Sequence, residues 1–384
     1  MNTNKRTPKL RFKGFTDDWE QRKLSDILKV NSGKDYKHLD QGTIPVYGTG
    51  GYMLSVNESL SNIDAIGIGR KGTIDKPQYL KAPFWTVDTL FYLTALDKHS
   101  ILFLYYLMQL IPWKKFDEST GVPSLSKTTI ENINGYVPSK PKEEELISAL
   151  FSQLDKSITL HQRKLDNLKL KKKALLQKLF PKNGERYPEL RFPGFTDAWE
   201  QRKLDELTIF IGDGLHGTPK YDENGSYYFI NGNNLVDNKV SVTEETKKVA
   251  FEALGNDDRR LDSTAILMSI NGTIGTLARY NNENIMLGKS VAYITPKNIN
   301  RDFLFYQLQG NVIQSYFYKN LTGTTIKNLG LGTIKNTIVM STLSEEESTI
   351  GRFFYKLDQY ITLHQHKLDR LISIKKGLLQ QLFV

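Results

Sequence analysis

Few stretches of this sequence have the residue types and spacing of a catalytic site. GIGRKG at Gly67–Gly72 has the glycine spacing of a dinucleotide-binding loop, but such a loop opens a helix, and here Pro77 follows within a few residues. Asp237, Glu245 and Lys247 are the residue types of a metal-dependent nuclease, yet they lie in a charged run typical of a solvent-exposed loop. Six histidines and no cysteine give no cluster with zinc-ligand spacing. We expect a non-catalytic chain with no metal or cofactor of its own.

Polar side chains beside glycine turns are better suited to reading DNA. Glycine lets the backbone approach a duplex closely, arginine and asparagine can pair with guanine and adenine edges, and serine, threonine and lysine bind phosphates. The alternative is that these are ordinary loops, since loops are polar in most proteins. The candidate DNA contacts are Lys34, Tyr36, Thr49, Arg70, Lys71, Thr73, Ser124, Ser126 and Lys127 in the first half, and His216, Thr218, Lys220, Asn231, Asn233, Asn271, Thr273, Thr322, Thr324, Thr325 and Lys327 in the second.

The composition is compatible with a DNA partner. The formal net charge is +10 over 384 residues, which favours a polyanion as a partner and a division into two or three domains. The absence of cysteine indicates a reducing compartment, and the first residues lack the apolar core of an export signal. The longest apolar run, at Ile101–Trp113, is too short to span a membrane. We expect a cytoplasmic protein with no membrane partner.

The chain is written as two half-copies. Residues 8–24 and 188–204 share 14 of 17 positions, and residues 158–180 and 361–383 share 16 of 23. The two middles between these phrases differ strongly, although RKGTI at Arg70 matches INGTI at Ile270. The second middle also carries about 20 extra residues before Gly272. Because the first phrase is repeated so faithfully around different middles, we interpret it as a structural joint rather than a base reader.

The second repeated phrase has the heptad spacing of a coiled coil. Apolar residues recur at alternating steps of four and three, interrupted by Lys172 and Lys375 in equivalent places. An antiparallel pairing keeps these two lysines apart, whereas a parallel pairing stacks them, so the pattern favours antiparallel helices. The predicted helix seam comprises Ile147, Leu154, Ile158, His161, Leu165, Leu168, Ile350, Leu357, Ile361, His364, Leu368 and Leu371.

These patterns divide the chain into four segments. Residues 1–140 form the first variable domain, including the joint at 8–24, and residues 141–180 form the first long helix. Residues 181–342 form the second variable domain, including the joint at 188–204, and residues 343–384 form the second long helix.

Two variable domains, each opened by a phrase such as LRFKGFTDDWEQRKL and closed by a helix such as ITLHQRKLDNL, resemble the specificity subunits of type I restriction-modification systems. The resemblance extends over essentially the whole chain. It implies an α+β fold with two α/β target recognition domains, separated by two long antiparallel coiled-coil helices and related by a pseudo-twofold repeat.

The resemblance also implies partners and a role. Each recognition domain is expected to read one half of a bipartite site on double-stranded DNA, while the helices set the spacer and dock two modification (methyltransferase) subunits. Those subunits are expected to hold S-adenosylmethionine, and restriction subunits with ATP-dependent translocase and nuclease activity to join the full complex. The alternative is a stand-alone bipartite DNA-binding protein, such as a repressor or an anti-restriction factor.

Overall fold

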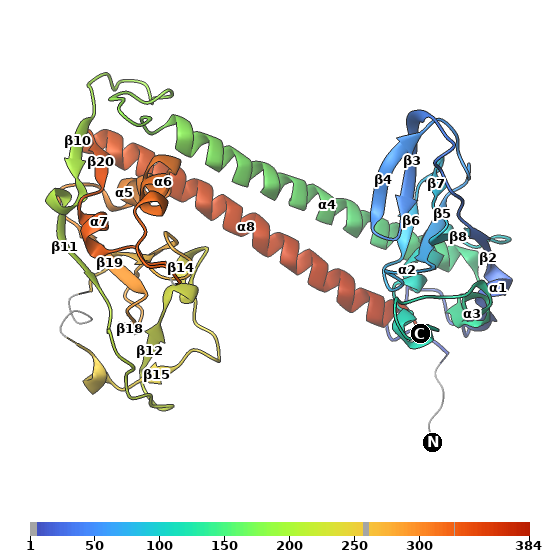
Figure 1. Cartoon of the computed structure of the whole chain (residues 1–384). Coiled ribbons are helices and arrows are strands. Elements are labelled where there is room, and N and C mark those ends of the chain that lie inside the picture. The colour runs from blue at the N-terminus through green and yellow to red at the C-terminus, as the bar shows by residue number, and fades with distance from the viewer. Residues whose placement is uncertain (1–5, 256–260, 326) are drawn as a thin grey trace. The chain divides into compact units, whose positions relative to one another are not determined.

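The computed structural model describes residues 6–255, 261–325 and 327–384, and these residues form two compact units (Figure 1). Unit 1 comprises Met1–Arg163 and Gln365–Val384, and unit 2 comprises Lys164–His364. The boundaries fall inside the long helices α4 (Pro141–Lys178) and α8 (Ser344–Leu382). Each unit therefore contains one variable domain together with part of both helices, which groups the chain differently from the four segments expected from the sequence.

Unit 1 contains three small sheets. A four-stranded antiparallel sheet has the order β2-β8-β5-β6, a three-stranded sheet has the order β4-β3-β7, and β1 pairs with β9. The strands are β1 (Glu20–Lys23), β2 (Leu28–Ser32), β3 (Gln41–Gly48), β4 (Gly51–Val56), β5 (Ala65–Gly69), β6 (Gln78–Leu80), β7 (Trp85–Thr86), β8 (Leu90–Ala95) and β9 (Asn134–Val137). Its short helices are α1 (Leu24–Ile27), α2 (Ile101–Met108), η1 (Trp113–Phe116) and α3 (Lys127–Asn132).

Unit 2 repeats this plan with additions. Its largest sheet has the order β11-β19-β16-β17-β14-β13, a three-stranded sheet has the order β15-β12-β18, and β10 pairs with β20. The strands are β10 (Glu200–Lys203), β11 (Thr208–Asp213), β12 (Tyr227–Ile230), β13 (Leu235–Val236), β14 (Asn238–Val240), β15 (Lys248–Val249), β16 (Ile266–Ser269), β17 (Leu277–Arg279), β18 (Ile285–Leu287), β19 (Val291–Pro296) and β20 (Ile338–Ser341). Its short helices are η2 (Leu204–Leu207), η3 (Gly232–Asn234), η4 (Phe251–Ala253), α5 (Arg301–Leu308), α6 (Asn311–Lys319) and α7 (Leu331–Lys335).

The two units share strand order and direction. In each three-stranded sheet the middle strand, β3 or β12, pairs antiparallel with one neighbour and parallel with the other. In each larger sheet the order β2-β8-β5-β6 corresponds to β11-β19-β16-β17. The hairpin β13–β14 is added at the β17 edge and lies within the extra residues that the sequence places before Gly272. The repeat seen in the sequence is therefore a repeat of topology.

The equivalent helices α2 and α5 begin in the same way. The side chains of Ser100 and Asn300, each the residue before its helix, accept hydrogen bonds from the backbone N–H of Phe103 and Phe303. Such caps satisfy amide groups that have no partner within the helix. The two long helices carry glutamates in their first turns, where a negative charge is favoured by the helix dipole.

Each unit has an aromatic core built from four parts of the chain. In unit 1, Phe383 stacks on Phe103 with ring centroids 5.2 Å apart and also packs against Trp19 and Phe151. Unit 2 places the residue equivalent to Phe383, Phe180, against Trp199, Phe303 and Phe354. The end of each repeated helix phrase thus lies in the core of the unit that carries the other variable domain.

The repeated joint ties the start of each domain to both long helices. Arg11 forms a two-pronged ion pair with Glu143 at 2.6 and 2.8 Å, and Arg191 forms the same pair with Glu346 at 2.7 Å for both contacts. The backbone N–H of Leu10 donates to the carbonyl of Gln381. These contacts agree with a structural role for the phrase.

Candidate nucleic-acid interface and helix seam

The turn after β5 brings several predicted DNA contacts together in unit 1. The backbone N–H of Arg70 donates to the carbonyl of Thr89, and Lys71 pairs with Ser124 across an isolated β-bridge. Gly72 has a φ of +99°, in the left-handed region that favours glycine, and its N–H donates to the Pro123 carbonyl. The side chains of Arg70 and Lys71 are exposed. The turn therefore presents two cations beside the loop that contains Ser124.

That loop is held by its own acidic residues. Asp117 Oδ1 accepts hydrogen bonds from the backbone N–H groups of Ser124 and Ser119, and these bonds lower the pKa of the Asp117 carboxyl from its ordinary value. Ser126 caps α3 by accepting from the N–H of Thr129. Lys127, the first residue of α3, is exposed. Ser126 is thus used by the fold, whereas the exposed Lys127 side chain pairs with Glu131, with Nζ 3.6 Å from Oε1.

The remaining predicted contacts of unit 1 fall into two groups. Thr49 lies in the β3–β4 turn, and a Cβ added to Gly72 would approach its hydroxyl to 3.5 Å, so Thr49 belongs with the Gly72 turn. Thr73 is half-buried in the same turn. Lys34 is exposed on the segment that leads to Tyr36.

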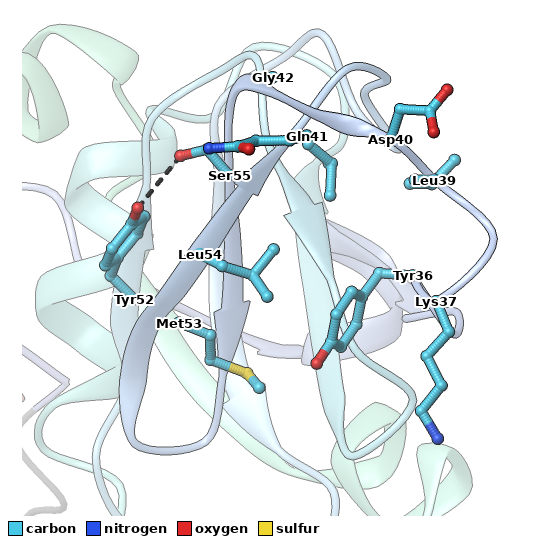
Figure 2. A pocket seen from close by; sticks show the side chains of 11 residues that line it. Tyr36, Lys37, Leu39, Asp40, Gln41, Gly42, Tyr52, Met53, Leu54 and Ser55 are labelled. Carbon is cyan, nitrogen blue, oxygen red and sulfur yellow. Dashed lines mark hydrogen bonds between the residues drawn. The ribbon is translucent and has the colours of Figure 1, made fainter.

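Tyr36 lines a shallow hollow of about 680 Å³ in unit 1 (Figure 2). The exposed side chains of Tyr52 and Met53 on β4 also line it, together with Lys37. Tyr52 Oη and Ser55 Oγ lie 3.1 Å apart at one side. The structure therefore places Tyr36 beside side chains of the β3–β4 hairpin.

Unit 2 forms the equivalent turn with uncharged residues. Asn271 takes the place of Lys71 and bridges to Asn328, as Lys71 bridges to Ser124. Gly272 has a φ of +72°, matching Gly72. The hydroxyl of Thr273 donates to the carbonyl of Gly232, which lies next to Asn231. The two turns thus have one backbone arrangement and different side chains.

The loop opposite this turn supplies the other predicted contacts. Thr322 pairs with Asn328, and exposed side chains follow at Thr324, Thr325 and Lys327. Asn231 Oδ1 accepts from the Ser290 hydroxyl at 3.0 Å, while the neighbouring Asn233 is exposed. The structure thus gathers most of the polar candidates of unit 2 around Asn271.

The segment with His216, Thr218 and Lys220 is joined to this region through the backbone. Leu215 bridges to Gly288, and the N–H of Gly288 donates to the carbonyl of Ile230. His216 Nε2 lies 2.8 Å from Asp213 Oδ2, and its side chain is 75% exposed. Thr218 and Lys220 are exposed. For all these residues, contact with DNA stays a prediction.

The glycine motif at Gly67–Gly72 and the acidic residue Asp237 both lie at strand ends and turns. Gly67–Gly72 spans the end of β5 and the following turn, so the glycines do not open a helix. Asp237 lies in the β13–β14 turn with a φ of 49°. In residues 6–255, 261–325 and 327–384, no three or more histidine or carboxylate side chains are grouped as metal ligands. Over the same ranges no helix has the length and apolar content needed to cross a membrane.

The predicted seam residues face inward on both long helices. Buried members are Ile147, Leu165, Ile350, His364 and Leu368, and half-buried members are Leu154, Ile158, His161, Leu168, Leu357, Ile361 and Leu371. Within unit 1, Phe383 contacts Phe151 and Lys375 contacts Asp155. The residue numbers along α8 therefore decrease where those along α4 increase. In unit 2, Phe354 contacts Phe180 and Asp358 contacts Lys172, which gives the same antiparallel direction. The antiparallel pairing is confirmed.

Each of the two seam lysines has an aspartate partner on the other helix. Lys172 Nζ lies 2.7 Å from Asp358 Oδ1 in unit 2, and Lys375 Nζ lies 2.7 Å from Asp155 Oδ1 in unit 1. The side chains of Lys172 and Asp358 are only 14% and 16% exposed. Polar pairs of this kind specify the register of an otherwise apolar seam.

A tyrosine from each domain completes the arrangement. Tyr306 of α5 donates to Asp358 Oδ2 at 2.7 Å, and Tyr106 of α2 donates to Asp155 Oδ2 at 2.8 Å. Burial, followed by the neighbouring carboxylate, raises the pKa of both phenols. We call these two sets the Lys–Asp–Tyr clusters.

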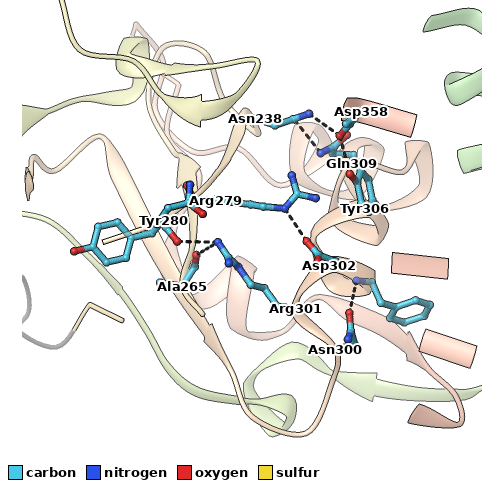
Figure 3. A network of polar contacts seen from close by, with 12 residues as sticks. Asn238, Ala265, Arg279, Tyr280, Asn300, Arg301, Asp302, Tyr306, Gln309 and Asp358 are labelled. Atoms are coloured by element: carbon cyan, nitrogen blue, oxygen red, sulfur yellow. Dashed lines mark hydrogen bonds and ion pairs between the residues drawn. The ribbon is translucent and has the colours of Figure 1, made fainter. Parts of the chain in front are cut away.

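In unit 2 the cluster is extended by amides (Figure 3). Asn238, on the added β13–β14 hairpin, donates to Asp358 Oδ2 at 3.0 Å. Gln309 Nε2 donates to Asn238 Oδ1 at 3.2 Å, and Gln309 Oε1 accepts from Lys172. The inserted hairpin is therefore tied to the helix pair of its own unit.

Sequence reasoning missed the aspartates and tyrosines of these clusters, although a signal was present. Asp155 and Asp358 each stand in a Leu-Asp pair three residues before ITLHQ. Tyr106 and Tyr306 occupy equivalent places in the matching stretches FLYYL and FLFYQL. Repeated polar residues beside a repeated apolar seam could have indicated a paired network.

Comparison with known proteins identifies the family. A family model described as the type I restriction modification DNA specificity domain matches residues 16–170 and again residues 196–372. The chain belongs to this family and carries two copies of its domain. It is the non-catalytic subunit that recognises DNA sequence in a type I restriction-modification system, and it does so with two domains.

Individual relatives agree with the family match. The type I restriction enzyme MjaVIII specificity subunit from Methanocaldococcus jannaschii is 22% identical over 299 residues, which are 73% of this chain and 69% of that protein. The crystal structure of a type I restriction-modification S subunit from M. genitalium has a TM-score of 0.68 at 16% identity, over 98% of this chain and 99% of its own. A second solved structure, from work on complex assembly and conformational transition of the type I system, has a TM-score of 0.54 at 15% identity. The match covers 95% of this chain and 97% of the other.

Proposed function

We propose that each unit reads one half of a split DNA site through its glycine turn and the facing loop. The observation that supports this proposal is the repeated backbone with different side chains: Lys71 opposite Ser124 in unit 1, and Asn271 opposite Asn328 in unit 2. A lysine carries a positive charge, whereas an asparagine amide is neutral. Two such turns would prefer different bases, which suits an asymmetric site.

A domain exchange tests this division. Residues 25–140 would be replaced by the equivalent segment of another family member, and the methylated sites would be mapped in cells that also produce the modification subunit. We expect one half of the recognised site to change and the other half to stay. A change in both halves would contradict independent reading by two domains.

Single substitutions at the two turns refine the test. Asn271→Ala should weaken discrimination at one base of the unit 2 half-site by about 1 kcal/mol, the lower end of the range for base contacts. Lys127→Ala, at an exposed site expected to meet phosphate, should weaken binding to all sequences alike. Equal effects on cognate and non-cognate DNA for both variants would refute the base-reading role of Asn271.

We further propose that α4 and α8 set the unread spacer between the half-sites and dock two modification subunits. The helices contain 38 and 39 residues, corresponding to a length of about 57 Å at 1.5 Å per residue. Because the helix frame is repeated, two copies of one partner can bind equivalent surfaces. These partners would hold S-adenosylmethionine and transfer the methyl group, restriction subunits would join them, and the complex would act in the cytoplasm.

Native mass spectrometry of the co-expressed complex tests the stoichiometry. We expect two modification subunits for each copy of this chain, and methyl transfer only in the presence of that subunit. A stable active complex with a single modification subunit would contradict the repeated docking surface. A chain that binds its DNA site but no modification subunit would instead support the stand-alone alternative.

A further inference from the structure

We propose that the two Lys–Asp–Tyr clusters determine how strictly the protein measures the spacer. Lys172, Asp358 and Tyr306 in unit 2, and their counterparts in unit 1, act as positioning residues that hold each recognition domain at one place along the helix pair. This inference rests on the proposed function, in which the helices set the spacer.

The first reason is that apolar seam residues define register weakly. The predicted seam consists mainly of leucine and isoleucine at heptad spacing, so a shift by one heptad would again place apolar residues together. A lysine at such a position removes this freedom, because it needs its aspartate opposite. The charged atoms of Lys172 and Asp358 are mostly shielded from water, so a shifted register would leave both charges poorly solvated and unpaired.

The second reason is that each aspartate is shared between a helix and a domain. Asp358 uses Oδ1 for Lys172 and Oδ2 for the Tyr306 hydroxyl. Lys172 Nζ also lies 5.1 Å from the centroid of the Tyr306 ring, within range of a cation–π contact. The carboxylate therefore fixes α5, and with it the domain, to α4 and α8 at the same point. Asp155 does the same for α2 in unit 1.

The scale of the effect follows from helix and DNA geometry. A slip of one heptad, seven residues at 1.5 Å each, moves a residue by about 10.5 Å along the helix axis. One base pair occupies about 3.4 Å of the duplex axis. A register error of one heptad would therefore displace a recognition domain by about three base pairs, which is enough to change the spacer that fits.

The test is a spacer series with the intact complex of this chain and its modification subunit. Duplexes would carry the native half-sites with the native spacer, or with about one to three base pairs added or removed, and methylation rates would be measured on each. For Lys172→Met and Lys375→Met, we expect the preference for the native spacer over its neighbours to fall by about tenfold, a typical size for coupling between contacting groups. Lys172→Arg should restore most of the preference.

The chain offers matched controls. Lys173 and Lys376 are the next residues on the same helices, and both side chains are exposed. Lys173→Met and Lys376→Met should keep the wild-type spacer preference. Discrimination against a mismatch within either half-site should stay within about twofold of the wild type in every variant, because no cluster residue belongs to the predicted base-reading turns.

A second pair of variants covers a failure to fold. Asp358→Asn and Asp155→Asn keep the shape of the side chain and can still accept from the tyrosine, but they lose the charge that pairs with lysine. Folded variants of either kind that keep the wild-type spacer preference would overturn the inference. If the wild-type complex itself shows no spacer preference, the proposed function fails first, so the two failures are distinguishable.

Discussion

The mirrored ion pairs at the joints give a sharp prediction about local stability. In unit 2, Arg191 Nε and Nη2 contact the two carboxylate oxygens of Glu346 at 2.7 Å each. The side chain of Arg191 is 14% exposed and that of Glu346 is fully buried. The perturbation is Arg191→Met, which keeps an apolar stem of similar length and removes the charge.

The expected loss of stability follows from what Glu346 retains. Removing one partner of a buried pair costs about 3–5 kcal/mol, because the other charge stays buried. Glu346 keeps a hydrogen bond from the Thr342 hydroxyl at 2.6 Å and lies in the first turn of α8, where the helix dipole favours a carboxylate. We therefore expect a loss of stability at the lower end of this range, about 3 kcal/mol. This loss corresponds to a change of about two orders of magnitude in the local opening equilibrium.

Hydrogen exchange followed peptide by peptide measures this, because it reports opening of each unit separately. Peptides of unit 2 should lose about 3 kcal/mol of protection in Arg191→Met, while those of unit 1 should change by less than about 0.5 kcal/mol. Arg11→Met should give the reverse pattern. Arg202→Met is the control, since its pair with Glu206 is exposed to solvent and should contribute little to stability. A loss no larger than that of the control would refute the reasoning.

Three further predictions concern unit cores, pH and a turn. Phe383→Ala should destabilise unit 1, and Phe180→Ala unit 2, by about 3–5 kcal/mol each in the same exchange measurement, because each ring fills an aromatic core. The hydrogen bond with Glu144 raises the pKa of His99, so this pair should stabilise unit 1 fully below the unfolded histidine pKa of about 6.5 and lose its effect as pH rises through the folded value. A urea midpoint that changes identically with pH in wild type and His99→Gln would contradict this. Gly72→Ala should cost about 1–2 kcal/mol in thermal unfolding through backbone strain alone.

The repeat made much of this architecture predictable. The repeated phrases predicted a plan of two similar halves, and the heptad spacing with its two lysines predicted the antiparallel helix pair that the structure shows. The position of the extra residues in the second half corresponds to the β13–β14 hairpin. Repeats and apolar periods can be recognised in the sequence because each copy needs apolar side chains at equivalent core positions.

Other features depend on contacts that no local pattern carries. The sequence placed Lys172 in the seam but gave no partner, because Asp358 is far away in the chain and adjacent to the apolar register rather than on it. Ser126 stays a predicted DNA contact, and its hydroxyl also caps α3, which residue type did not indicate. Residue type alone predicts Tyr36 as a DNA contact, and the fold places it along a hollow with Tyr52 and Met53. Such pairings are fixed by tertiary packing, which residue type alone does not encode.

The placement of Phe383 affects the order in which the chain can fold during synthesis. Unit 2 is continuous, from Lys164 to His364, whereas unit 1 needs Gln365–Val384 to complete the core around Trp19. At about 5–20 residues per second, the ribosome needs roughly 10–40 s to make the intervening segment. The first variable domain is therefore synthesised well before Phe383. Its aromatic core lacks this ring until the end of α8 has left the ribosome.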